Sequence, residues 1–121
     1  MKIEIIILGC GSSSGVPVIG NDWGKCDPKN KKNRRLRASI LIKTENTNIL
    51  VDATPDLRQQ LLNARIQSLD AVLITHTHAD HIHGVDDFRF LNVKMNKHLD
   101  LFACERDILE IKKSLATYLR I

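Results

Sequence analysis

Residues 71–84 read AVLITHTHADHIHG, and this stretch decides how the rest of the chain is interpreted. It begins with a run of apolar and β-branched residues that is typical of a short buried strand. His76 and His78 then alternate in an extended segment, so their side chains point to the same side. Asp80 and His81 follow at the turn into the next segment. The pattern predicts two neighbouring pairs of polar side chains at the end of a strand.

The four side chains of these pairs are metal ligands by type. Neutral imidazole is a leading ligand for zinc and similar ions, and a carboxylate either binds a metal or orients an imidazole. The alternating histidines suit one ion, and Asp80 and His81 suit a second. Two metal ions about 3.5–4 Å apart are a known device for hydrolysing phosphoesters and amides. His83 lies just beyond the pairs, and three roles stay open for it: substrate contact, alternative ligand or bystander.

The regions before and after this stretch predict an α/β protein. Strands come first along the chain and then alternate with helices, and ligand sites in such sheets commonly lie at the carboxyl ends of strands. Thr54 is a plausible N-cap for the first helix. The expected strands cover residues 3–8, 38–44, 47–51, 71–75 and 99–103, and the expected helices cover residues 55–64 and 106–118.

A long irregular segment separates the first two strands and ends near Arg37. Its glycine-rich start, residues 9–15, has two interpretations: a phosphate cradle of backbone N–H groups, or a turn needed only for chain reversal. Its second part, Lys25 to Arg37, is strongly basic. That part is either a solvated loop or a rim that attracts phosphate groups.

Length and composition set further bounds. The 121 residues suit one domain, and the hydrophobic fraction of 43% is enough for a core. No apolar run is long enough to span a bilayer, so no membrane partner is expected. The three cysteines are widely spaced and odd in number, which argues against a disulfide framework and favours a cytoplasmic location.

Taken together, these motifs resemble those of a known family. THTHADHIHG after an apolar strand resembles the signature of the metallo-β-lactamase superfamily, and the strand ending at Asp52 resembles its first motif. LGCGSSSGVPVIG and HIHGVDDFR are similar to the branch that contains the phosphoribosyl cyclic phosphate phosphodiesterases. The resemblance implies an αββα-type metallo-hydrolase fold. Residues 1–121 would be the N-terminal half of its sandwich, a mixed sheet flanked by helices in a truncated domain.

The resemblance also implies a role for each residue of the site. His76 and His78 would hold one metal, and Asp80 and His81 the other. Asp80 would also contact the attacking water as a catalytic residue, and Asp52 would support the ligands from behind. The implied cofactor is Zn²⁺ or Mn²⁺, up to two ions. The implied reaction is hydrolysis of a small phosphodiester by a metal-activated hydroxide.

Downstream of the motif, this chain departs from the family pattern. The family expects a further histidine, a bridging aspartate and a last histidine, whereas the only later histidine is His98 in a polar turn. The site is therefore incomplete in this chain. Completion by self-association or by a complementing C-terminal half is expected, and an inactive or split half-domain is the alternative to an active enzyme.

Two further alternatives concern the substrate. The basic segment from Lys25 to Arg37 keeps an RNA-processing nuclease open, with nucleic acid as the partner. Arg89 is either a substrate contact, like His83, or part of a structural ion network with Asp86 and Asp87, the interpretation we favour slightly.

Overall fold

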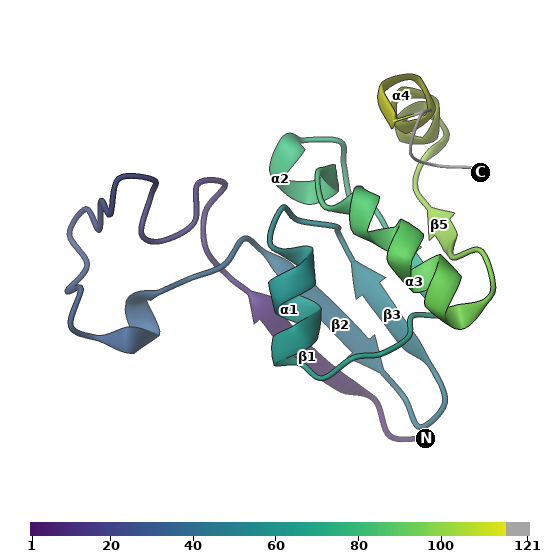
Figure 1. Cartoon of the computed structure of the whole chain (residues 1–121), viewed down its shortest axis with the longest axis horizontal. Helices are drawn as coiled ribbons and strands as arrows, with labels where there is room; N and C mark the ends of the chain where they lie inside the picture. Colours follow the sequence, from purple (N-terminus) through teal and green to yellow (C-terminus); the bar gives the residue numbers. More distant parts are fainter. Residues whose placement is uncertain (116–121) are drawn as a thin grey trace.

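The computed structural model describes residues 1–115, in which one five-stranded sheet carries the fold (Figure 1). The strands lie in chain order, β1-β2-β3-β4-β5. The first two contacts, β1 with β2 and β2 with β3, are antiparallel, and the last two are parallel. The strands are β1 (Glu4–Gly9), β2 (Ser39–Lys43), β3 (Asn48–Val51), β4 (Ala71–Leu73) and β5 (Asp100–Phe102).

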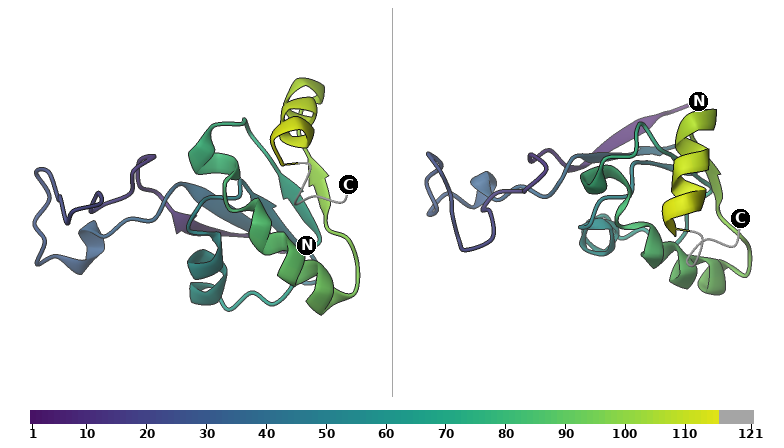
Figure 2. Two further views of the ribbon diagram at one scale, coloured as in Figure 1. Left: turned by 45° about the horizontal axis from the view of Figure 1, so that its top comes forward. Right: turned by 90° about the horizontal axis from the view of Figure 1, so that it is seen from above.

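The helices are short, and among residues 1–115 none is long and apolar enough to cross a membrane. Figure 2 shows α1 and α3 on one side of the sheet, with α4 beyond the β5 edge. The helices are α1 (Leu57–Asn63), α2 (Ala79–Ile82), α3 (Phe88–Met95) and α4 (Glu105–Leu115), with 3₁₀ turns at Lys31–Asn33 and Val85–Asp87.

The side of the sheet that faces α1 and α3 forms the core. Leu41, Leu50 and Val72, from three adjacent strands, are fully buried there, and Leu57 of α1 and Phe88 of α3 pack over them. Buried aliphatic side chains on neighbouring strands are what the sequence pattern predicts for this face. This packed face is the only large apolar cluster of the residues that the structure describes.

The opposite side of the sheet is apolar but uncovered. Side chains alternate along a strand, so the neighbours of the core residues point away from α1 and α3. Ile7 is 68% exposed and Phe102 56% exposed as a result. We call this surface the open face; the cross-strand register assigns to it Ile5, Ile7, Ile40, Ile42, Ile49, Val51, Leu73 and Phe102.

These observations confirm the predicted α/β class and the mixed sheet, with three differences in detail. The first helix begins at Leu57 rather than at residue 55, so the predicted N-cap role of Thr54 is wrong. Its hydroxyl instead accepts the N–H of Asp56 in a turn before the helix. Helix α3 was not predicted. The helix expected at 106–118 is found as α4, and its last three residues lie outside the described part.

The topology brings several loops to one edge of the sheet. β1, β3 and β4 run in the same direction, because β1 and β3 are both antiparallel to β2, and β4 is parallel to β3. Their carboxyl ends therefore share an edge. The long basic segment leaves from β1 there, Asp52 follows β3, and the histidine stretch follows β4.

Candidate metal centre

Asp52 is the buried anchor of this edge. Its residue is 5% exposed, and its backbone has a φ of 64°, a left-handed conformation that aspartate tolerates better than most residues. One carboxylate oxygen, Oδ1, accepts the N–H of Thr75 at 2.8 Å. The other, Oδ2, accepts the Thr75 hydroxyl at 2.7 Å and lies 2.6 Å from Nδ1 of His81. One carboxylate thus ties the end of β3 to both ends of the histidine stretch.

These contacts fix the tautomers of two histidines. The hydroxyl of Thr75 has one proton, which it donates to Asp52, so it accepts the proton on Nδ1 of His76 at 2.9 Å. Nδ1 of His81 donates directly to Asp52. In both rings Nε2 is left with its lone pair, as a metal-binding imidazole requires. Asp52 therefore prepares two histidines, one directly and one through Thr75.

The four predicted ligands occur as two pairs. Nε2 of His76 lies 3.2 Å from Nδ1 of His78, and Oδ2 of Asp80 lies 3.2 Å from Nε2 of His81. Two ligand atoms of one tetrahedral zinc ion, each about 2.0–2.1 Å from it, lie about 3.3 Å apart. The donor set and the spacing within each pair therefore fit a zinc ion.

The two pairs are neighbours, because the ring centroids of His76 and His81 are 4.0 Å apart. Within residues 1–115, however, no three His, Cys, Asp or Glu side chains gather as one metal-binding group. A catalytic zinc commonly has three protein ligands and one open position. The described residues thus supply two ligands for each ion, which is the deficit that the sequence indicates.

Helix α2 is held against the end of β3 by a close backbone contact. The N–H of Ala53 donates to the carbonyl of His81 at 2.8 Å, and the N–H of Gly84 donates to the carbonyl of Ala53 at 2.9 Å. A Cβ atom on Gly84 would lie 1.9 Å from the carbonyl oxygen of Thr54. Only glycine allows this approach, so Gly84 fixes where the turn with Asp80 and His81 sits.

Two polar residues of the site were missed by the sequence analysis. Thr75 was predicted only as a strand residue; its hydroxyl directly before the first histidine was the available signal. Glu110 of α4 accepts the hydroxyl of Thr77 at 2.9 Å and so restrains the backbone between His76 and His78. It lies 33 positions further along the chain, and no local motif marks it.

The two candidate substrate contacts lie outside the hydrogen-bonded cluster. His83 is exposed at the end of α2, where its N–H bonds to the carbonyl of Ala79. Arg89 donates from Nε and Nη2 to the two carboxylate oxygens of Asp86, at 2.8 and 3.0 Å. This pair agrees with the ion-network interpretation of Arg89 and Asp86.

The glycine-rich turn after β1 uses its N–H groups internally. Gly11 donates to the carbonyl of Leu36 at 2.7 Å, and Gly15 donates to the carbonyl of Ser12 at 2.9 Å. A phosphate cradle needs such groups free to point at the ligand. The contacts therefore favour chain reversal over anion binding for residues 9–15.

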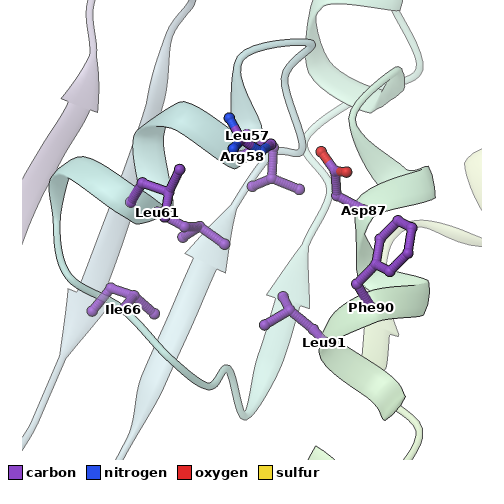
Figure 3. A pocket seen from close by; sticks show the side chains of 8 residues that line it. Leu57, Arg58, Leu61, Ile66, Asp87, Phe90 and Leu91 are labelled. Atoms are coloured by element: carbon purple, nitrogen blue, oxygen red, sulfur yellow. The ribbon is translucent and has the colours of Figure 1, made fainter. Parts of the chain in front are cut away.

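The helical layer contains a separate groove of about 400 Å³ between α1 and α3 (Figure 3). Its walls are mostly apolar, and Arg58 and Asp87 lie among them. None of the predicted metal ligands lines it. The chemistry-bearing groups are therefore at the sheet edge rather than in this groove, which is lined by Leu57, Arg58, Leu61, Leu62, Ile66, Asp87, Phe90 and Leu91.

Comparison with known proteins agrees with this placement of the site. Residues 47–121 match the family described as "Beta-lactamase superfamily domain". The chain is similar to a solved diphosphatase of the PhnP family, with a TM-score of 0.89 and 37% identity over 97% of this chain and 47% of that one.

Two curated relatives have different names. A Porphyromonas gingivalis protein named octanoyltransferase is 43% identical over 89% of this chain, which spans 22% of that protein. Ribonuclease Z of Treponema denticola is 29% identical over 84% of this chain, which spans 29% of that enzyme. The chain thus spans less than half the length of each of these relatives. It belongs to the metallo-β-lactamase superfamily and corresponds to the N-terminal portion of its members.

Proposed function

We propose that residues 1–121 are the N-terminal half of a metal-dependent phosphodiesterase and contribute part of its active site. The observation that carries this proposal is the contact set of Asp52, which orients His76 and His81 so that each presents Nε2 beside a second ligand. A structural role alone would not require two histidines to be prepared in this way.

The proposed cofactor is zinc or manganese, with up to two ions. His76 and His78 would hold one ion, and Asp80 and His81 the other; the 3.2 Å separations support this assignment. Bound metal ions of this kind lower the pKa of water and offset negative charge on phosphoryl oxygens. The role of Asp80 is to orient the attacking water through its carboxylate. Asp52 keeps both histidines in the metal-binding tautomer, while His83 and Arg89 remain candidates for substrate contact.

The missing ligands would come from additional polypeptide that covers the open face. A continuous apolar sheet surface in water favours burial against a partner. The shared edge of β1, β3 and β4 borders both the open face and the ligand pairs, so a partner on that face lies close to the site. We propose a complementing C-terminal half as this partner; self-association of the chain is the competing arrangement that the experiment distinguishes.

A small phosphodiester is the proposed substrate, since one relative is named a diphosphatase and another a ribonuclease. The test is hydrolysis of bis(p-nitrophenyl) phosphate by the purified protein with zinc or manganese. We expect turnover that a chelator abolishes and that His78→Ala lowers to background. His98→Ala is the matched control, because this exposed histidine lies in the turn between α3 and β5.

Two outcomes of this experiment are informative. Turnover that survives both the chelator and His78→Ala contradicts the proposal. An inactive chain that gains turnover when a C-terminal half is added supports the split-domain form of the proposal. The apparent mass in solution then separates a complementing half from self-association.

A further inference from the structure

The segment between β1 and β2 projects from the sheet as a long arm (Figures 1 and 2). Its base is closed by Val16 and Arg35, which exchange two backbone hydrogen bonds of 2.9 and 2.8 Å. We call residues 16–35 the basic arm. None of its residues belongs to the buried core. Packing of the fold therefore does not explain why this segment is kept.

The basic arm carries the net charge of the chain. It holds six lysine and arginine side chains and two aspartates, a net charge of +4, while the other residues contain twelve basic and twelve acidic side chains. Among the ion pairs of residues 1–115, none includes a lysine or arginine of the arm. Its two aspartates, Asp22 and Asp27, accept backbone N–H groups in turns. The cations are left to face solvent or a polyanion.

Local contacts hold the arm in shape although it lacks a core. The guanidinium of Arg34 lies 5.3 Å from the ring centre of Trp23, and Asn33 donates to the carbonyl of Asp27. Just outside the base, Arg37 pairs with Asp56 at 3.0 Å and so fixes the arm to the segment before α1. A surface ordered before binding loses less conformational entropy when a ligand arrives.

The arm starts at the edge that carries the candidate metal centre. It leaves the sheet after β1, whose carboxyl end shares an edge with those of β3 and β4. A small phosphodiester has no need of a charged surface that projects away from the site. A strand of repeating phosphates can lie along the arm and still reach the edge with Asp52 and the histidines.

We propose that the basic arm binds the phosphate backbone of single-stranded nucleic acid. An anionic membrane is a weaker match, because Ile19 is the only large apolar side chain of the arm that is almost fully exposed, at 94%. Membrane binding by a surface segment scales with the apolar area that it buries. Only delivery of the strand to the metal centre rests on the proposed function; binding by the arm stands independently of it.

The test is fluorescence anisotropy of labelled single-stranded RNA and of DNA with the same sequence, with a chelator present to prevent cleavage. If four of the six cations contact phosphates, affinity falls about 50-fold between about 50 and about 200 mM salt. A quadruple variant, Lys29→Gln, Lys31→Gln, Lys32→Gln and Arg34→Gln, should weaken binding at low salt by at least about tenfold and nearly remove the salt dependence. Preference for RNA or DNA shows which nucleic acid is the ligand.

A matched control removes the same charge elsewhere through Lys43→Gln, Lys94→Gln, Lys112→Gln and Lys113→Gln, and it should keep most of the affinity. Circular dichroism verifies that both variants fold. Equal losses in the two variants, salt-independent binding, or binding to anionic vesicles without binding to oligonucleotides would each overturn the proposal. The arm variant should still hydrolyse bis(p-nitrophenyl) phosphate, whereas His78→Ala should still bind the strand, so failure of one proposal is distinguished from failure of the other.

Discussion

The two faces of the sheet are built from the same kinds of residue but have different surroundings. Leu50 on the packed face is fully buried beneath the helices, whereas Ile7 on the open face is 68% exposed. The metal centre shows the same division: Asp52 and its contacts are complete, but each ligand pair lacks further members. The difference teaches that the chain stabilises its own core and prepares ligands, while leaving one apolar surface and part of the site for a partner.

The largest expected effect comes from Gly84→Ala, which tests how tightly the packed side holds the ligands. The new Cβ would lie 1.9 Å from the carbonyl oxygen of Thr54, and a backbone atom cannot move aside cheaply. We expect a loss of more than about 4 kcal/mol in the free energy of unfolding. Urea denaturation measures it, and Gly84→Val should be worse still. A stable Gly84→Ala protein with unchanged zinc affinity would show that α2 is not held in this way.

The second prediction compares the faces directly. Leu50→Ala removes a fully buried side chain and should cost about 2–5 kcal/mol of stability. Ile7→Ala removes an exposed side chain and should change stability by about 0.5 kcal/mol or less in the isolated chain. Thermal unfolding of dilute protein gives both values. Equal losses would mean that the open face is already covered, for example by self-association.

The third prediction concerns Asp52→Asn, which keeps the shape of the side chain but removes its charge. The variant weakens the support for His81 and, through Thr75, for His76. Replacing such a carboxylate typically lowers metal affinity about 10–100-fold. Asp70→Asn is the control, because Asp70 accepts the N–H of Asn48 at the other end of β3. The same loss of zinc affinity in both variants would contradict the role of Asp52.

The smallest expected effect is that of Glu110→Ala on α4. Loss of the hydrogen bond from Thr77 should free the backbone between the two alternating histidines. Because the contact is exposed, we expect a stability change of only about 0.5 kcal/mol. Faster amide hydrogen exchange at residues 76–78 is the sharper readout. Exchange that is unchanged from wild type would remove Glu110 from the description of the site.

Much of the fold could be predicted because the strands are short β-branched runs with turn residues between them. Helix α3 could not, since Phe90 and Val93 point to solvent and disturb the apolar periodicity of an amphipathic helix. The limits of α1 were misjudged because the Thr54 hydroxyl serves the turn before the helix.

The site was predictable to a similar extent. The spacing of the histidines indicates paired ligands, and the structure places the paired atoms 3.2 Å apart. The role of Thr75 depends on β3 and β4 lying side by side, and that of Glu110 depends on where α4 packs. Neither adjacency is written in the local sequence, so both contacts required the structure.

The most direct test of the central claim is zinc affinity, measured by competition with a chromophoric chelator. The account predicts weak binding that falls when His76 and His78 are replaced by alanine, and falls again when Asp80→Ala and His81→Ala are added. His98→Ala should leave the affinity unchanged. Zinc binding that persists at wild-type strength after all four ligands are replaced would contradict the account.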